Sequence, residues 1–303
     1  MTSGILPINK PEGLSSAKAV ARIKRILKVK KVGHTGTLDP FATGLLLCAV
    51  NKGTRISRFF LDGHKRYTAT VLLGVETDTY DKTGKIVTRV GVDRVKSIKT
   101  ETIEKTVAGF CGVQEQVPPS FSALKHQGQP LYKLARQGKM IQKPPRTIEI
   151  FDIRITGIDL PCIDIDVACS SGTYIRTIAY DIGQQLKCGA HLTALCRTGS
   201  SQFTAGDALE WDELISMDTE AVEKRIVPMS EALSFLPKVF VKDPVKNKIQ
   251  YGQKLGPNDL DIAAESMPSG QTIRVLDEND NLLALVVFNE KSRGYDYSCV
   301  FAG

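Results

Sequence analysis

The segment from His34 to Gly44 constrains the backbone more than any other part of this 303-residue chain. Gly36 and Gly44 permit backbone geometries that other residues resist, and Pro40 pushes the preceding Asp39 toward an extended conformation. One carboxylate therefore lies in a run of small, turn-forming and apolar residues. Because Asp before Pro is also a common start of a helix, these residues leave two interpretations open, an N-cap and a catalytic acid.

Metal and disulfide chemistry are not expected. No second acid, Cys or His stands at metal-ligand spacing from Asp39, and the four histidines lack a His-x-x-x-His spacing. The seven cysteines are odd in number and include no Cys-x-x-Cys pair. We therefore expect buried thiols in a reducing compartment, and no metal.

Length and composition predict a soluble globular protein of about two domains. Its 303 residues are 42% hydrophobic and 24% charged. No apolar run approaches the ~20 residues that span a bilayer, and the N-terminus lacks the apolar region of a signal peptide. We expect a cytoplasmic protein with no membrane partner, and nothing in the sequence demands more than a monomer.

The net charge of +7 suggests a polyanionic partner, and the bases are concentrated in one segment. Between residues 18 and 31 half of the residues are basic and none is acidic. Val20, Ile23 and Leu27 recur at helical spacing after Ser15 and Ser16. The pattern predicts a helix with one buried face and one cationic face, which favours contact with phosphates over a merely solvated surface.

The hydrophobic pattern predicts an α/β (α+β) domain followed by a small β module, with the boundary near residue 235. In the first part we expect helices at 54–61, 100–110 and 173–186, capped at Thr54 and by Ser170 to Gly172, and strands at 5–8, 45–50, 67–73, 147–158, 162–169 and 191–197. Short strands at 249–252, 272–276, 282–288 and 295–301 then predict a module resembling a β-barrel.

Residues 113–146 differ in composition from their surroundings. They contain prolines, Phe121 and several bases but little periodic hydrophobic pattern, apart from a short helix expected at 131–136. A long, irregular, basic insertion in a folded domain is usually a mobile functional segment or a variable one.

Three further segments stand out, around Tyr67, Arg176 and Leu195. Taken singly, each has an ordinary structural explanation: an aromatic of a sheet, a surface base and a core leucine. Together with the Asp39 segment, however, they resemble the bacterial tRNA pseudouridine synthase B (TruB) family, in order and approximate spacing over residues 4–200. The motifs that carry the resemblance are Gly33-His34-Thr35-Gly36-Thr37-Leu38-Asp39-Pro40-x-Ala42-Thr43-Gly44, Arg66-Tyr67, Gln116-x-Pro118-Pro119-x-Phe121-Ser122-Ala123-Leu124-Lys125 and Gly172-Thr173-Tyr174-Ile175-Arg176.

The resemblance implies a pseudouridine synthase fold over residues 1–235, with a central mixed, largely antiparallel sheet flanked by helices and loops. It also implies a PUA-like RNA-binding barrel over 236–303. The implied activity is isomerisation of uridine 55 in the T arm of tRNA to pseudouridine, without cofactor, metal, guide RNA or obligatory protein partner. Residues 113–146 match the thumb-like segment of the family, which closes on the T loop.

The resemblance also implies roles for individual residues. Asp39 would be the nucleophile, and Arg176 would form a salt bridge that keeps its carboxylate ionised and oriented. Tyr67 would stack on the extruded uracil and help C5 lose its proton. The remaining implied substrate contacts are Leu195 as an apolar wall, His34 and Tyr174 at the substrate, and Lys10 as a buttress.

Two other functions stay open at this point. A guide-RNA-dependent synthase would share the Asp39 motif but would generally lack the full thumb segment. An RNA-binding or RNA-folding module, with Asp39 only as a cap, would leave the combination of Asp39, Tyr67 and Arg176 unexplained. The sequence also leaves open whether Asp39 attacks ribose C1′, attacks uracil C6 or first removes a 2′-proton.

Overall fold

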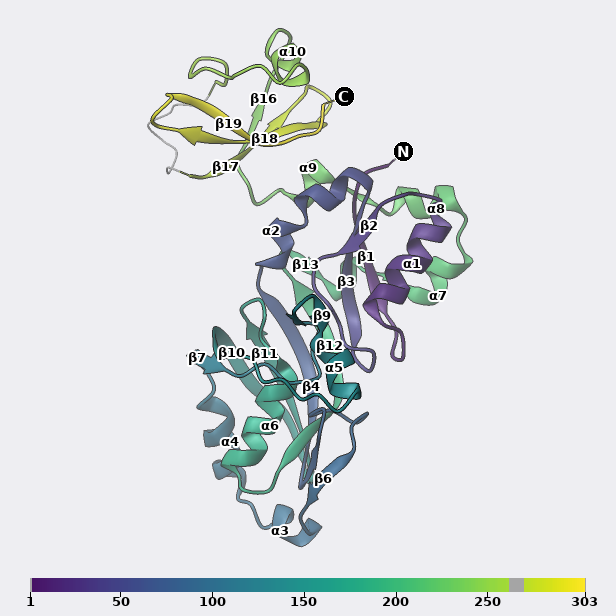
Figure 1. Ribbon diagram of the computed structural model, residues 1–303, viewed down its shortest axis with the longest axis vertical. Helices are drawn as coiled ribbons and strands as arrows, with labels where there is room; N and C mark the ends of the chain where they lie inside the picture. The colour runs from purple at the N-terminus through teal and green to yellow at the C-terminus, as the bar shows by residue number, and fades with distance from the viewer. Residues whose placement is uncertain (1, 262–269, 303) are drawn as a thin grey trace.

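The computed structural model describes residues 2–261 and 270–302 and is built around one large mixed sheet (Figure 1). Most strand pairs are antiparallel; β1–β14 and β3–β12 are parallel. The predicted mixed, largely antiparallel sheet is therefore confirmed. The main path of the sheet runs through β14 (Leu209–Glu210), β1 (Gly4–Lys10), β3 (Thr43–Val50), β12 (Ala190–Ser200), β4 (Lys65–Leu73), β11 (Cys162–Cys169), β10 (Arg146–Asp159) and β7 (Gly112–Gln116).

Shorter elements complete the first part of the chain. Three short strands pair with strands of the main path: β2 (Val32–His34) with β3, β13 (Phe203–Thr204) with β12, and β15 (Val227–Pro228) with β1. Two small hairpins join β5 (Val75–Thr77) with β6 (Ile86–Arg89), and β8 (Lys125–His126) with β9 (Gln129–Pro130). The helices here are α1 (Ser16–Ile26), α2 (Arg58–Leu61), α3 (Val92–Lys96), α4 (Thr100–Ala108), α5 (Leu131–Arg136), α6 (Ile175–Gln185), α7 (Trp211–Ser216), α8 (Thr219–Lys224) and α9 (Met229–Ala232), with 3₁₀ turns η1 (Asn51–Ile56) and η2 (Ala205–Asp207).

The main hydrophobic core lies between this sheet and the helices. Alternate residues of β4 enter it, namely Tyr67, Ala69, Val71 and Leu73, which explains the strict alternation of that segment. From α6, Ile175, Ile178, Ala179 and Ile182 enter the same core at helical spacing. The core therefore fixes α6 against the strands that carry the candidate site residues.

The basic helix is confirmed as α1. The Oγ of Ser15 accepts a hydrogen bond from the backbone N–H of Lys18, and Ala19 and Ile23 are buried. The helix ends at Ile26, so only four of the seven bases lie on it (Lys18, Arg22, Lys24 and Arg25), while Lys28, Lys30 and Lys31 follow. All seven side chains are exposed, and none of them is in an ion pair within the described residues.

Two predicted helix starts were wrong. Thr54 lies inside the 3₁₀ turn η1, where its hydroxyl donates to the carbonyl of Asn51, and α2 begins only at Arg58. The second helix, α6, begins at Ile175, with Tyr174 as its N-cap. The hydroxyl of Ser170 is not free to cap that helix, because it accepts a hydrogen bond from the backbone N–H of Glu149 in β10.

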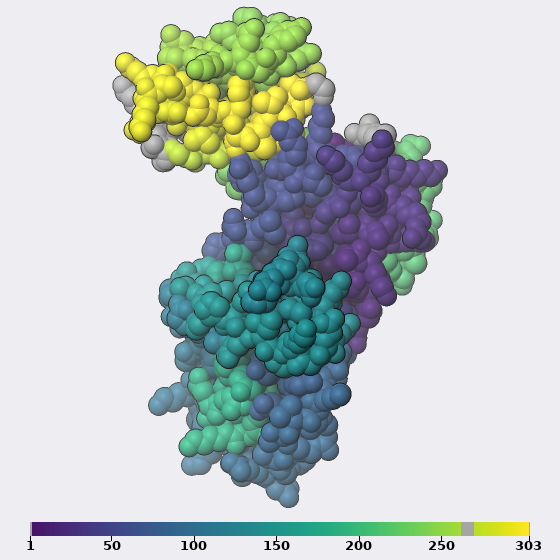
Figure 2. Space-filling view, in the orientation of Figure 1, coloured from purple at the N-terminus to yellow at the C-terminus, as the bar shows by residue number. Residues whose placement is uncertain are grey.

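The insertion is shorter than predicted, because both of its ends belong to the central sheet. Gln116 is the last residue of β7 and pairs with Arg146, the first residue of β10. Residues 117–145, called the insertion below, contain the β8–β9 hairpin and α5, whose Leu131, Leu134 and Ala135 are buried. Figure 2 shows this teal segment on the front face, beside the purple N-terminal part.

The C-terminal part forms a separate four-stranded sheet of β16 (Lys238–Phe240), β17 (Thr272–Leu276), β18 (Leu282–Asn289) and β19 (Gly294–Val300) (Figure 1). The described residues do not close into the predicted barrel. The strand predicted at 249–252 was also wrong, because its first two residues belong to α10 (Val245–Gln250). Val245 and Ile249 have helical spacing after Pro244. Leu276 and Phe301 pack with Leu45 of β3 in a second core, which joins this sheet to the first part.

The described cysteines are all free thiols, as expected, but their burial varies. Cys48, Cys169 and Cys188 are buried, whereas Cys111 is exposed. Among the residues that the structure describes, no helix is both long and apolar enough to cross a lipid bilayer.

Candidate active site

The segment of residues 34–44, called the Asp39 loop below, is held on one side by the start of α1. The Oγ of Ser16 accepts from the backbone N–H of Leu38 at 2.8 Å and donates to the carbonyl of Leu38 at 3.0 Å. On the other side of Asp39, the Pro40 carbonyl accepts from the backbone N–H of Gly13 at 2.7 Å. Both neighbours of Asp39 are therefore fixed by hydrogen bonds.

Two glycines of this loop have the conformations that their type predicts. Gly36 has φ of 140° and Gly44 has φ of 98°, a region that side chains resist. At Gly44 an added Cβ would also lie 2.4 Å from the carbonyl oxygen of Arg197, so the loop can lie against β12 only with glycine there.

Asp39 does not cap a helix. The residues after it form a turn, with Ala42 N–H donating to the Asp39 carbonyl, and lead into β3. Its carboxylate instead accepts two hydrogen bonds from Arg176, from Nε to Oδ2 at 2.8 Å and from Nη2 to Oδ1 at 3.2 Å. This bidentate geometry fixes both the position and the plane of the carboxylate.

The two members of this pair differ in exposure. The side chain of Arg176 is 3% exposed, whereas that of Asp39 is 32% exposed. A buried guanidinium therefore anchors a carboxylate that remains open to an incoming molecule.

The other N–H groups of Arg176 are also used. Nη1 donates to the carbonyl of Thr79 and Nη2 to that of Phe121, each at 2.8 Å. The carboxylate of Asp81 lies 3.6 Å from Nη1, and its other oxygen accepts from the backbone N–H and hydroxyl of Thr83. The polar turn after β5 and the insertion therefore both orient Arg176.

Tyr67 lies on β4 opposite Arg197 of β12, and both are buried. Burial raises the pKa of Tyr67, while the positive charge of Arg197 opposes the rise. Arg197 itself donates to the carbonyls of Leu45, at 2.7 Å, and Gly36, at 3.1 Å. A second buried guanidinium thus supports the Asp39 loop and Tyr67 together.

Lys10 is fully buried and braces the same loop. Its Nζ donates to the carbonyls of Pro11 and Leu14, each at 2.7 Å, and lies 3.5 Å from that of Pro40. Burial lowers the pKa of Lys10 to about 8, partly offset by the negative charge of Asp39.

His34 lies on β2, five residues before Asp39, and its Nδ1 is buried without a hydrogen-bond partner. Burial and, to a smaller extent, the positive charge of Arg197 lower the pKa of His34, so its imidazole is neutral near pH 7.

Tyr174 immediately precedes α6 and is held at both ends. Its backbone N–H donates to the side-chain oxygen of Gln116, and its carbonyl accepts from the side-chain NH₂ of the same residue. The guanidinium carbon of Arg146 lies 4.6 Å from the centre of the Tyr174 ring. Leu195 pairs with Ala69 across β12 and β4 and is 7% exposed.

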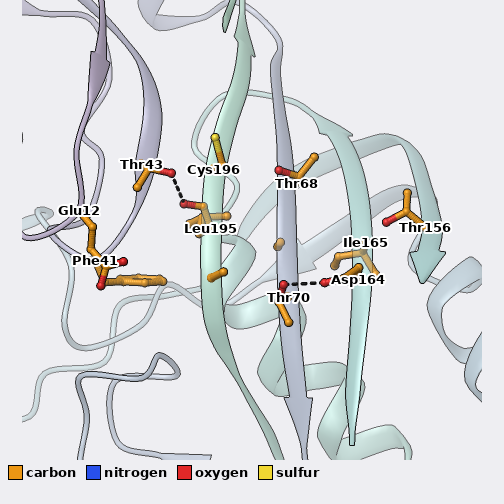
Figure 3. A pocket seen from close by; sticks show the side chains of 12 residues that line it. Glu12, Phe41, Thr43, Thr68, Thr70, Thr156, Asp164, Ile165, Leu195 and Cys196 are labelled. Atoms are coloured by element: carbon orange, nitrogen blue, oxygen red, sulfur yellow. Dashed lines mark hydrogen bonds between the residues drawn. The ribbon is translucent and has the colours of Figure 1, made fainter. Parts of the chain in front are cut away.

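Leu195 also lines a cavity of about 410 Å³ beside the Asp39 loop, shown in Figure 3. Phe41 and Thr43 border it from that loop, and the Thr43 hydroxyl donates to the Leu195 carbonyl. Asp39, Tyr67 and Arg176 are not among its lining residues, so this cavity does not include the ion pair.

The structure thus joins most of the predicted site residues into one cluster: Arg176 contacts Asp39, Lys10 contacts the Asp39 loop, and Arg197 links that loop to Tyr67. The sequence reasoning did not single out Asp81 or Arg197 as site residues. Asp81 lies in a turn rich in polar residues, and nothing in its spacing distinguishes it from Asp78. Arg197 is the last residue of the strand predicted at 191–197, but only the register of β12 shows that it is opposite Tyr67.

Chemically, the arrangement supplies one oriented carboxylate, a buried phenol and two buried guanidinium groups. Among the residues that the structure describes, no three His, Cys, Asp or Glu side chains are grouped as metal ligands would be. An oriented, partly exposed carboxylate can act as a nucleophile or as a general base.

Family models cover most of the first part of the chain. A model described as "TruB family pseudouridylate synthase (N terminal domain)" matches residues 24–175, and one described as "tRNA pseudouridylate synthase B C-terminal domain" matches residues 176–234. The chain belongs to the TruB family of pseudouridylate synthases. The resemblance inferred from the motifs is therefore confirmed.

Individual TruB relatives match over most of their length. A protein of Chromohalobacter salexigens named tRNA pseudouridine synthase B is 40% identical over 87% of this chain and 85% of its own. One of Desulfotalea psychrophila with the same name is 49% identical over 72% of this chain and 89% of its own.

Among solved structures, one described as "Crystal Structure of a Cbf5-Nop10-Gar1 Complex" contains a chain that is similar in fold. It matches with a TM-score of 0.70 and 27% identity, over 98% of this chain and 84% of that chain.

Proposed function

We propose that this protein is a tRNA pseudouridine synthase that converts uridine 55 in the T arm of tRNA to pseudouridine. The observation that carries the proposal is the bidentate pair of Arg176 with the partly exposed Asp39, in a chain of the TruB family. The TruB relatives named tRNA pseudouridine synthase B support tRNA as the substrate.

The reaction needs no group beyond the protein and its RNA. The bond between N1 of uracil and C1′ of ribose breaks, a bond between C5 and C1′ forms, C5 loses its proton, and N1 gains one. Three first steps would use the Asp39 carboxylate: attack on C1′, attack on C6, and removal of the 2′-proton. In each of them Arg176 keeps the carboxylate in one orientation.

The base must leave the loop before any of these steps, which costs a few kcal/mol of stacking. In our proposal Tyr67 offsets part of that cost by stacking on the detached uracil and helps C5 lose its proton. Leu195 forms the apolar wall beside the base. His34 and Tyr174 contact the extruded nucleotide, and Lys10 holds the loop that carries Asp39.

The insertion is the segment that would close on the T loop. It contributes directly to the site, because the Phe121 carbonyl accepts from Arg176. The exposed bases of α1 and of the residues after it have no acidic partners in the described structure and suit the phosphates of the stem. We propose that the protein acts as a monomer in the cytoplasm, without guide RNA, cofactor or obligatory protein partner.

The test is conversion of an unmodified T stem-loop by the purified protein alone, followed by mapping of pseudouridine. We expect wild-type protein to modify the RNA and Asp39→Asn to bind it while losing roughly 10⁴-fold or more of the rate. Asp93→Asn, which changes an exposed carboxylate on α3, is the matched control and should retain activity.

Each alternative predicts a different result. Binding without conversion by wild-type protein would favour an RNA-binding module. Conversion only after addition of guide RNA and partner proteins would favour a guide-dependent synthase. Substantial turnover by Asp39→Asn would refute the assignment of the nucleophile.

A further inference from the structure

The two ends of the insertion meet at one residue pair. Gln116 closes β7, Arg146 opens β10, and the two pair across the sheet. Any movement of residues 117–145 relative to the catalytic domain therefore starts from these two positions.

Both residues of this pair hold Tyr174. The side-chain amide of Gln116 accepts from the backbone N–H of Tyr174 at 2.8 Å and donates to its carbonyl at 3.0 Å. Arg146 packs its guanidinium on the ring of the same tyrosine, 4.6 Å from the ring centre. Gln116 is 3% exposed, so water does not compete for these two bonds.

Tyr174 in turn sets the first turn of α6. It is the N-cap of that helix, has no side-chain cap bond, and its carbonyl accepts from the N–H groups of Thr177 and Ile178. Arg176 lies in this first turn. A shift of Tyr174 therefore moves the backbone from which the guanidinium reaches Asp39.

We propose that Gln116 is a positioning residue, which links the base of the insertion to the orientation of the Asp39–Arg176 pair. Its amide fixes the backbone of Arg176 through Tyr174, while the Phe121 carbonyl, five residues further along, fixes the guanidinium. The ion pair is thus aligned when the start of the insertion is in place on α6. This inference rests on the proposed function, because it names what aligns the nucleophile of that reaction.

Gln116→Met tests the link, because it keeps the length of the side chain and removes both hydrogen bonds. Gln114→Met is the matched control: it lies on the same face of β7, and its amide donates to the Phe110 carbonyl and not to Tyr174. The measurements are the single-turnover rate of pseudouridine formation at saturating enzyme, RNA affinity in an Asp39→Asn background, and the thermal unfolding midpoint.

We expect Gln116→Met to lose roughly 10- to 100-fold in the single-turnover rate, because small displacements of reacting groups carry penalties of that size. RNA affinity should stay close to that of wild type, and Gln114→Met should retain the wild-type rate. If Gln116→Met does not fold, Gln116→Glu is the second variant: it keeps the acceptor for the Tyr174 N–H and loses only the donor to the Tyr174 carbonyl. We expect it to lose roughly 10-fold in the single-turnover rate, the lower end of the same range.

Two results would separate the inference from the proposed function. A wild-type rate in a folded Gln116 variant, or a loss confined to RNA affinity, would overturn the positioning role. If wild-type protein and Gln114→Met also fail to convert the RNA, the proposed function itself has failed.

Discussion

Arg176→Lys tests whether the shape of the guanidinium, and not only its charge, holds the site together. Arg176 donates two hydrogen bonds to Asp39 and one each to the carbonyls of Thr79 and Phe121, and it lies 3.6 Å from Asp81. An ammonium has three donors on one nitrogen and cannot reach acceptors that are spread around a planar fork.

The magnitude follows from the groups that lose a partner. At least one partly buried carbonyl is left unpaired, which costs about 1–3 kcal/mol, and the bidentate bond to Asp39 becomes a single contact. Because Asp39 is a third exposed, water compensates part of that second loss. We therefore expect the free energy of unfolding to fall by ~2–3 kcal/mol and the single-turnover rate to fall by roughly 100-fold.

Urea denaturation and single-turnover conversion of T-arm RNA measure these two quantities. The control is Arg154→Lys, which makes the same substitution in an exposed pair, 2.7 Å from Asp152. That change should alter stability by less than about 0.5 kcal/mol. If Arg176→Lys behaves like the surface variant in both assays, the guanidinium geometry is not what orients Asp39.

Two further predictions concern the residues around this pair. Tyr67→Phe keeps the ring and should slow release of tritium from 5-³H-uridine in the RNA. Tyr67→Leu removes the ring and should slow this release by at least a further ~10-fold, because stacking on a base contributes ~1–3 kcal/mol. Equal rates for the two variants would contradict a stacking role. For Lys10, burial lowers the pKa from 10.5 to about 8, so the unfolded chain binds more protons than the folded one between these pH values and stability rises with pH there. Relative to Lys10→Met, wild-type protein should gain ~1–2 kcal/mol in urea denaturation between about pH 7.5 and 9.5, and a constant difference would show that the charged form is not penalised.

Local pattern was sufficient for much of the first part of the fold. The alternation of residues 67–73 predicted β4, whose odd-numbered residues enter the core. One prediction failed where a tertiary contact overrode a local signal. Ser170 is of a residue type that often caps helices, but its hydroxyl accepts a hydrogen bond from the Glu149 N–H of β10, and α6 begins only at Ile175.

In the C-terminal part, short apolar segments did not distinguish a strand from a helix. Ile249 was predicted in a strand and lies in α10, because four residues separate it from Val245 on the same buried face. The described residues there form an open four-stranded sheet and not the predicted barrel.

The sequence by itself determined the loop around Asp39, because Gly36, Pro40 and Gly44 act on the backbone locally, through φ angles and the space left by a missing Cβ. It also determined the family, because the motifs recur in order. The sequence offered Arg176 as the partner of the carboxylate only through that family resemblance, and the tertiary structure supplied the contact itself and its geometry. Arg176 lies 137 residues after Asp39, and Arg197 reaches Tyr67 only through the register of β12 on β4. Pairing across such separations depends on how the sheet and α6 pack, and no local pattern encodes it.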